Sequence, residues 1–292
     1  MENAKQLVPL LVQGSMFLMI MAVAMQCPWR EVVEQIRHPR LPVRAFLAVN
    51  VVVPVTAVLL ALALDLPQPI AAGLILMAVS PLAPLVPGNA LKTGAQRSYI
   101  LATYLLLIVI AIPVVPLSLK LIDRVFGVEA TVPAATIAMI AFISALLPIA
   151  IGLLLAALAP RFAARAAGPI TLVSTLVLAL FVLLLLWLQG RVYLHMIGNF
   201  TILAFGLTVA SGIVAGHLLG GKDPENRGAL AIAAAIRHPG IAFAIANASG
   251  AGPGAKAAII LFLLNGVIIV SLYVAWLKRH LARRPAAAAG QP

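Results

Sequence analysis

AAAIRHPGIAFAIANASG, from Ala233 to Gly250, is an apolar stretch with an arginine, a histidine, a proline and a glycine in its middle. Proline lacks a backbone donor and glycine tolerates almost any backbone angle, so a helix entering this stretch is expected to break and restart. A break inside a bilayer is tolerated only where protein or a water-filled cavity surrounds the bare backbone groups. Arg237 could instead snorkel to the surface, but it lies about eight residues from the nearer end of its segment, roughly 12 Å along a helix. We therefore expect a buried polar site here.

The composition places most of the chain in a bilayer. Of 292 residues, 63% are apolar and 10% charged, against roughly 45–50% and 25% in soluble domains. The net charge of +12 comes from short connections and the C-terminal tail, so we expect membrane topology rather than a nucleic-acid partner. Cys27 is the single cysteine, which excludes an intrachain disulfide and argues against a thiolate metal site. The N-terminus leads into an apolar segment without a cleavage site, so we expect no removable signal peptide.

Nine apolar segments are long enough to span a bilayer. The connections between them are short, so we expect an all-α polytopic membrane protein with one transmembrane domain over residues 1–292 and a basic cytoplasmic tail at 279–292. The predicted segments are Leu7–Gln26, Val43–Leu64, Pro69–Leu91, Tyr99–Leu121, Pro133–Leu158, Pro169–Leu188, Met196–Leu219, Ala229–Ala251 and Ala255–Leu277.

The distribution of lysine and arginine predicts the orientation. Of the 20 Lys and Arg residues, fourteen fall in alternate connections and the tail on one side, five fall on the other side, and the last is Arg237. Because cytoplasmic loops carry the excess of positive charge, the C-terminus is expected in the cytoplasm and the N-terminus outside.

The third segment contains a second cluster of helix breakers. Pro81, Pro84, Pro87 and Gly88 lie within eight residues of one another, so this segment is also expected to come apart. The predicted broken helices cover about 69–95 and 226–251, and they lie five segments apart. Helices that lie an odd number of segments apart cross the membrane in opposite directions. This is the arrangement of an inverted repeat, in which two broken helices meet near the midplane. The alternative is a coincidence of proline spacing, and single prolines elsewhere in the segments are expected to produce ordinary kinks.

Several of these stretches together resemble the bile acid:sodium symporter family of secondary transporters. They are RHPR at Arg37–Arg40, the helix with VVVPVTAV, GLILMAVSP at Gly73–Pro81, and AIRHPGIAFAIANAS. The resemblance covers roughly Met16 to Trp276. It implies two inverted repeats, a panel domain, a core domain and two broken helices that cross in the core. Some family members lack the first helix, and nine segments match that shorter form. The resemblance also implies an integral protein of a bacterial inner membrane.

The chain departs from the family at the residues that hold sodium. The family's eighth-segment signature has a glutamate, three residues and a glutamine; aligned on Gly240, these fall on Ala233 and Arg237. In the third segment, the family's sodium-holding serine and asparagine fall on Val86 and Pro87. Sodium is a hard cation that takes several oxygen ligands. Valine, proline and alanine offer no side-chain oxygen, so both sodium sites look dismantled and no metal site is expected.

Arg237 suggests what replaces the sodium. A guanidinium supplies fixed positive charge and five donors that can satisfy carbonyl oxygens freed by the break. We hypothesise that Arg237 substitutes for the coupling ion, so that transport is sodium-independent and proceeds by facilitated diffusion, by exchange or with a proton. His238 is a candidate proton carrier because the ordinary pKa of histidine lies near neutrality. The alternative is a neutral imidazole bonded to a carbonyl that Pro239 has freed.

Other residues near the breaks are also candidates for substrate binding or coupling. Asn265 is the first of these, because relatives carry a polar residue at about this point of their last helix. For the asparagines the alternative is an interhelical hydrogen bond. Lys92 either attracts anions to the inner mouth or is a positive-inside anchor. The full candidate set is Arg237, His238, Pro239, Gly240, Asn265, Asn247, Pro87 and Asn89.

The resemblance implies a secondary transporter of a small or amphipathic organic anion that works by alternating access, without a cofactor. Two alternatives remain: a sodium-coupled symporter that binds the ion through backbone carbonyls, and a receptor or sensor of the same fold that does not transport. An intramembrane protease is not expected, because no aspartate or glutamate lies deep in a segment. A pump driven by ATP is not expected either, since the chain has no nucleotide-binding loop. The sequence indicates no oligomeric state.

Overall fold

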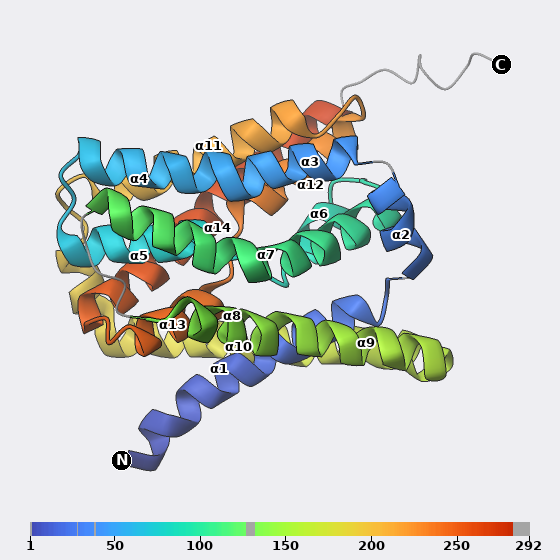
Figure 1. The fold of residues 1–292 in the computed structure, drawn as a ribbon, viewed down its shortest axis with the longest axis horizontal. Coiled ribbons are helices and arrows are strands. Elements are labelled where there is room, and N and C mark those ends of the chain that lie inside the picture. The colour runs from blue at the N-terminus through green and yellow to red at the C-terminus, as the bar shows by residue number, and fades with distance from the viewer. Residues whose placement is uncertain (1, 28, 38, 127–131, 283–292) are drawn as a thin grey trace.

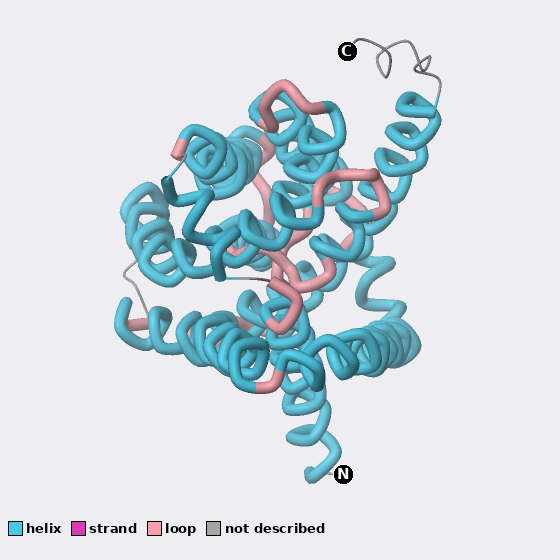
Figure 2. The backbone as a smooth tube through the Cα atoms, turned by 90° about the vertical axis from the view of Figure 1, so that its right-hand side faces the viewer, coloured by secondary structure: helices cyan, strands magenta, loops and turns pink. Residues whose placement is uncertain are grey.

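The computed structural model describes residues 2–27, 29–37, 39–126 and 132–282. Throughout these ranges the regular elements are helices, and no β-strand occurs in them (Figures 1 and 2). The expected all-α class is therefore confirmed. Most of the predicted basic tail at 279–292 lies outside the described residues, which end at Ala282.

The helices follow the predicted segments closely, and several segments are divided between two or three elements. In chain order they are α1 (Glu2–Ala24), α2 (Trp29–Arg37), α3 (Arg40–Phe46), the π-helical turn η1 (Leu47–Val52), α4 (Val53–Ala63), α5 (Gln68–Val79), α6 (Val86–Leu91), α7 (Arg97–Phe126), α8 (Ala134–Ala141), the π-helical turn η2 (Phe142–Leu146), α9 (Leu147–Leu158), α10 (Pro160–His195), α11 (Thr201–Leu219), α12 (Pro224–Ala235), α13 (Pro239–Ala248) and α14 (Pro253–Ala282).

Six helices in the described part of the chain are long and apolar enough to cross a membrane. They are Arg40–Ala63, Arg97–Phe126, Ala134–Leu158, Pro160–Leu184, Thr201–Leu219 and Pro253–Ala282. Shorter apolar helices at Gln13–Ala24, Gln68–Val79 and Pro239–Ala248 cover parts of the first, third and eighth predicted segments. The structure thus provides six full-length candidates where the sequence predicts nine spans, and two of the shorter helices are halves of the broken segments.

Exposed apolar side chains indicate which surfaces face lipid. Along α10, the side chains of Leu172, Leu176, Leu180 and Leu183 are all exposed, at the spacing of one helical face. Water would penalise a continuous leucine surface of this kind, whereas hydrocarbon does not. With the six candidate spans, this surface shows an integral membrane protein.

The helices form a thin layer and a larger bundle. The thin layer consists of α1, the continuous helix α8–η2–α9, and α10, which pack on one another at the bottom of Figure 1. The larger bundle contains the elements from α3 to α7 together with α11, α12 and α14. In Figure 1 the chain descends from α12, in the larger bundle, to α13, which lies beside the thin layer. The second break therefore runs between the two parts of the molecule.

Both clusters of proline and glycine interrupt a helix. In the first, α5 ends at Val79 and α6 begins at Val86; in the second, α12 ends at Ala235 and α13 begins at Pro239. The two breaks pair as a short antiparallel bridge between Leu82 and Arg237. The amide of His238 donates to the carbonyl of Pro81 (2.9 Å), and the amide of Ala83 donates to the carbonyl of Ile236 (3.3 Å). Each break thus satisfies backbone groups that the other exposes.

The sequence predicts simple kinks at single prolines, but two of these prolines follow π-helical turns. In a π-helical turn the carbonyl of residue i pairs with the amide of residue i+5. The residue five positions after Val49, in η1, is Pro54, which has no N–H to donate. The same spacing joins Ile143, in η2, to Pro148. Each turn therefore has one carbonyl without its helical partner.

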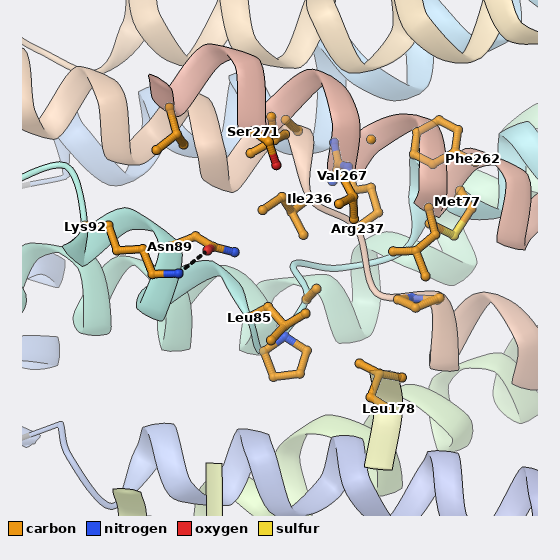
Figure 3. Close-up of a pocket in the computed structure, with 18 of the residues that line it drawn as sticks. Met77, Leu85, Asn89, Lys92, Leu178, Ile236, Arg237, Phe262, Val267 and Ser271 are labelled. Carbon is orange, nitrogen blue, oxygen red and sulfur yellow. Dashed lines mark hydrogen bonds between the residues drawn. The ribbon is translucent and has the colours of Figure 1, made fainter. Parts of the chain in front are cut away.

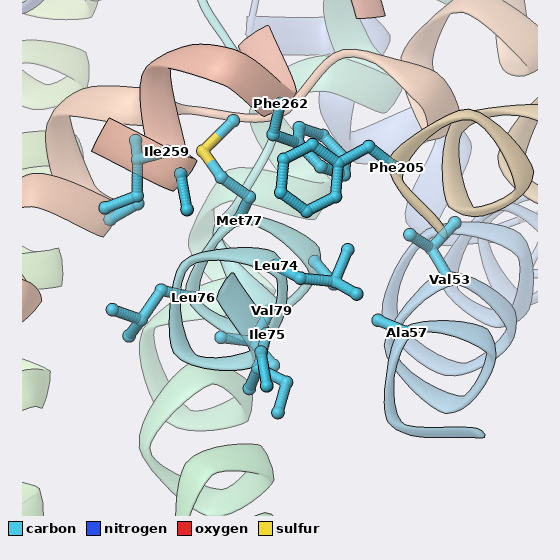
Figure 4. Close-up of a cluster of buried hydrophobic side chains, with 14 of the residues drawn as sticks. Val53, Ala57, Leu74, Ile75, Leu76, Met77, Val79, Phe205, Ile259 and Phe262 are labelled. Atoms are coloured by element: carbon cyan, nitrogen blue, oxygen red, sulfur yellow. The ribbon is translucent and has the colours of Figure 1, made fainter. Parts of the chain in front are cut away.

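The largest apolar core holds the first break against α14. Leu74 and Met77 of α5 pack with Val53, Phe205, Ile259 and Phe262 (Figure 4), and the rings of Phe205 and Phe262 lie 5.5 Å apart in a tilted arrangement. Gly73 allows α5 and α14 to touch, because a Cβ at this position would overlap the Cβ of Ala258 and lie 2.8 Å from the carbonyl oxygen of Ala255. The site below is therefore built on closely packed helices.

Candidate functional site

The guanidinium of Arg237 lies at the centre of the molecule. The residue is 1% exposed, and its side chain extends from the second break to two other elements. Nη2 donates to the carbonyl of Val49 (2.5 Å), and Nη1 donates to the carbonyl of Ser80 (3.3 Å), while Nε has no partner among the described residues. The Val49 carbonyl is the one that Pro54 leaves without a helical donor. Arg237 therefore joins η1, the first break and the second break.

Two helix ends place negative dipole charge near this guanidinium. Arg237 follows the C-terminus of α12 at Ala235, and its partner Ser80 follows the C-terminus of α5 at Val79. Helix C-termini carry partial negative charge and favour a nearby cation. The hydrogen-bond partners of the guanidinium are both backbone carbonyls, with no carboxylate among them. The positive charge is thus stabilised by dipoles and remains uncancelled by a formal negative charge.

His238 caps the second half of the broken helix. It is 2% exposed, and its Nδ1 accepts a hydrogen bond from the amide of Ile241 (3.2 Å), in the first turn of α13. An accepting Nδ1 assigns the proton to Nε2, which has no partner within the described residues. The ring is therefore neutral in this arrangement. The sequence left open a neutral imidazole bonded to a freed carbonyl; the structure has the neutral ring bonded to an amide instead.

The main cavity lies between the breaks, α14 and the thin layer. It encloses about 490 Å³ and is mostly apolar, with Met16 among its lining residues. Met77, Leu85, Leu178, Phe262 and Val267 lie on its walls (Figure 3). Its polar lining residues are Asn89, Lys92, Arg237, Ser271 and Lys278, and none of the lining residues is acidic. Lys92 Nζ donates to Asn89 Oδ1 (3.3 Å). The cavity thus combines apolar walls with a few polar groups, as ligand-binding pockets do.

A second, smaller hollow lies on the other side of Met16, and we call it the crevice. It encloses about 200 Å³ and is lined by Gln13, Gly14, Met16, Phe17, Ile143, Ser144, His238 and Gly240. These residues come from α1, from η2 and from the second break. His238 is the one lining residue of the crevice with an ionisable side chain, and its Nε2 is buried without a partner in the described part of the chain.

The predicted site residues divide into three groups. Arg237, Pro239 and Asn89 line the main cavity. His238 and Gly240 line the crevice. Three others line neither: Pro87 is buried in α6, Asn247 is exposed on α13, and Asn265 lies towards α11, where a Cβ on Gly206 would come 3.8 Å from its Oδ1. The placement of Asn265, whose Oδ1 is buried without a partner, does not fit the expected role at the cavity.

The positions that the family resemblance aligns with sodium ligands are apolar in this chain. Val86 and Ala233 belong to one buried cluster with Leu82 and Tyr104. The void beside them measures about 10 Å³, which is at most the room for one water molecule. Where side-chain oxygens would be needed for the ion, this chain packs aliphatic carbon.

Two cavity residues were not singled out from the sequence. Ser271 and Lys278 line the main cavity from α14, together with Val267, Val274 and Ala275. Their spacing of three and four residues marks one helical face, so the pattern was present in the sequence. In the count of charges, Lys278 is one of the fourteen Lys and Arg residues on the cytoplasmic side, which concealed its place at the cavity.

The fold and the site define a class: a helical membrane protein with two broken helices paired at its centre and a cationic cavity beside them, as in secondary transporters. The profile of the Sodium Bile acid symporter family matches residues 15–196, about three fifths of the 292-residue chain. The chain belongs to this family, whose members are transporters rather than enzymes. A search of curated proteins finds no match. The second break and Arg237 lie beyond the matched residues, so their roles depend on the geometry described above.

Proposed function

We propose that this protein is a sodium-independent secondary transporter of small or amphipathic organic anions, in which the guanidinium of Arg237 takes the place of the coupling cation. The observation that carries the proposal is the contact of this guanidinium with the carbonyls of Val49 and Ser80, near the C-terminal ends of α5 and α12. In transporters with broken helices, unwound carbonyls and half-helix C-terminal ends are the groups that coordinate sodium or protons.

With the positive charge of Arg237 fixed in the protein, the site would not need a sodium ion from solution. The donors of Arg237 already occupy two carbonyls that a sodium ion would otherwise take as ligands. An arginine stays protonated in proteins, so this charge is present at every physiological pH. The carbonyl-based sodium symporter, which the sequence left open, would require Arg237 to leave these partners. The geometry therefore favours the sodium-independent mechanism.

The charges around the main cavity support an anionic substrate. Lys92 and Lys278 line it together with Arg237, and no acidic residue does. A cavity lined by charges of one sign with apolar walls raises the local concentration of the opposite ion. The substrate would place its anionic group towards these cations and its apolar body against Phe262, Leu178 and the methionines.

The two-part fold supports alternating access. The family resemblance favours a bacterial inner membrane, and the charge distribution favours an outside N-terminus. The thin layer would serve as the panel domain and the larger bundle as the core domain. As the family resemblance implies, the chain would contain two inverted repeats. The main cavity lies at the seam between them and reaches Lys92 and Lys278, the residues that the charge distribution places on the cytoplasmic side. Rocking of the bundle against the layer would close this mouth and open the opposite one.

The test is uptake or exchange of labelled organic anions by proteoliposomes, with and without a sodium gradient. We expect transport by the parent to be unaffected by sodium and to be lost in Arg237→Gln. Arg227→Gln is the matched control, because Arg227 lies in α12, the helix that Arg237 follows, and also donates to a carbonyl, that of Gly221 (2.9 Å), but away from the cavity. Sodium-dependent transport by the parent would contradict the proposal. If no anion were transported under any condition, the receptor alternative would stand instead.

A further inference from the structure

Met16 separates the two hollows of the molecule. It is 2% exposed, and within the described part of the chain it is the one residue that lines both the main cavity and the crevice. Another hollow of about 400 Å³, bordered by α5, α7 and α13, shares no lining residue with the main cavity. The crevice is thus the hollow that a single side chain divides from the main cavity.

The side chain of Met16 rests on a glycine of the second break. A Cβ built on Gly240 would overlap Sδ of Met16, so this contact depends on the absence of a side chain at Gly240. Met16 also packs with Leu178 of α10, and Leu85 borders the same small cluster. It therefore fills the seam between the thin layer and the breaks.

The chain of the second break forms the opposite side of the same wall. Arg237 and Pro239 line the main cavity, whereas His238 and Gly240 line the crevice. A solute that moved from one hollow to the other would pass between this segment and Met16. Methionine suits such a position, because it is unbranched, has three rotatable bonds and adapts to irregular surfaces.

We propose that the crevice is the second mouth of the substrate path and that Met16, seated on Gly240, is the plug that closes this path. The inference rests on the proposed transport function, and it adds the route and the residue that blocks it. The crevice lies nearer the N-terminus of α1 than Met16 does, on the side where the charge distribution places the outside of the cell. A passage open at both ends would leak, so one barrier must stay closed while the other opens.

The test measures access and does not require a known substrate. In a Cys27→Ala background, which removes the single cysteine, Ser144→Cys places a thiol on the wall of the crevice. Sealed membrane vesicles of either orientation are exposed to a charged, membrane-impermeant thiol reagent, and the rate of modification is followed from each face. Met16→Ala removes the plug. Met77→Ala is the matched control, because Met77 is a buried methionine that lines the main cavity alone.

With Met16 present, the thiol should react from the crevice side and only slowly from the cavity side. Since minor conformations of a two-state protein are populated to about 0.1–10%, removing the plug should raise the rate from the cavity side by about tenfold or more. Met77→Ala should leave that rate unchanged. Equal rates from both faces in the parent, or an unchanged rate in Met16→Ala, would overturn the proposal.

A second variant guards against misfolding. Met16→Val keeps an apolar residue in the cluster but is too short to reach Gly240, so it should also raise access from the cavity side. Loss of anion transport with intact one-sided labelling would count against the proposed function alone. Two-sided labelling of the parent with normal sodium-independent transport would count against the plug alone.

Discussion

Replacing Arg237 by alanine separates its contribution to stability from its contribution to transport. The substitution removes two hydrogen bonds from a charged donor, to Val49 and Ser80, and such bonds contribute about 1.5–3 kcal/mol each, or about 3–6 kcal/mol together. It also removes a buried cation without a carboxylate partner, and the cost of burying such a charge is several kcal/mol. The two effects have opposite signs and similar size, so we expect the thermal midpoint in detergent to shift by only a few degrees.

Transport should respond far more strongly than stability. If the lower value of about 3 kcal/mol is what the guanidinium contributes to the transporting conformations, its loss lowers the transport rate by about 100-fold. The variant leaves a space beside two carbonyls and next to the main cavity, which external methylguanidinium at millimolar concentration can enter. We expect this cation to restore part of the transport by Arg237→Ala and to do nothing for Arg227→Ala. Sodium added to Arg237→Ala should act in the same direction, because it also takes carbonyl ligands.

The refuting results are specific. Near-normal transport by Arg237→Ala in proteoliposomes would show that no fixed cation is needed at the breaks. A thermal midpoint lowered by more than about 15 °C would show that Arg237 acts through folding, since about 2–4 °C corresponds to 1 kcal/mol in proteins of 150–250 residues. Rescue of Arg227→Ala by methylguanidinium would show that the added cation acts elsewhere.

Three further predictions concern packing, charge and an unpaired amide. Gly73→Val should lower the free energy of unfolding by about 1–3 kcal/mol, because its side chain would overlap Ala258 across the α5–α14 contact. Thermal unfolding in detergent measures this. Gly14→Val is the control, because nothing lies within 4 Å of a Cβ added at Gly14. Lys92→Gln and Lys278→Gln should each raise the KM for an anion about 2- to 5-fold, as expected for about 0.5–1 kcal/mol per exposed charge, and should leave kcat unchanged. Concentration series in proteoliposomes measure this. Lys222→Gln is the control and should have no effect, because Lys222 lies away from the cavity. Asn265→Leu should leave transport intact and keep or raise the thermal midpoint, because the buried Oδ1 has no partner to lose; a loss of transport would return Asn265 to the site.

The sequence predicts the breaks well because their cause is local. Pro81, Pro84 and Pro87 are clustered in one segment, and Pro239 is followed by Gly240 in the other, and these clusters interrupt the helix. A single proline does not, since Pro113 lies inside α7. The burial of Arg237 is predictable for a similar reason, since its distance from the ends of an apolar segment follows from helical rise. In both cases the argument needs only the residues within one segment.

The partners of these residues could not be predicted, because they depend on contacts between segments. Asn265 and Ser271 lie on the same helix, and only the packing of α14 decides that Ser271 faces the cavity while Asn265 lies towards α11. Pro54 suggests a kink from sequence alone; the shift to a π-helical turn, and the direction of the Val49 carbonyl, follow from tertiary structure. The role of His238 as the cap of α13 likewise depends on where the helix restarts.

A π-helical turn followed by a proline occurs in both parts of the molecule. In each turn, the residue five positions before a proline has a carbonyl without a helical donor. This residue is Val49 in the larger bundle and Ile143 in the thin layer. The first carbonyl is taken by Arg237, whereas Ile143 lines the crevice together with His238. A solute in the crevice would therefore contact two groups, His238 from the second break and Ile143 from η2 in the thin layer. Because the two groups belong to parts that are expected to move relative to each other, a solute that bridged them would favour the conformation in which the crevice is narrow, and its release would favour the open one.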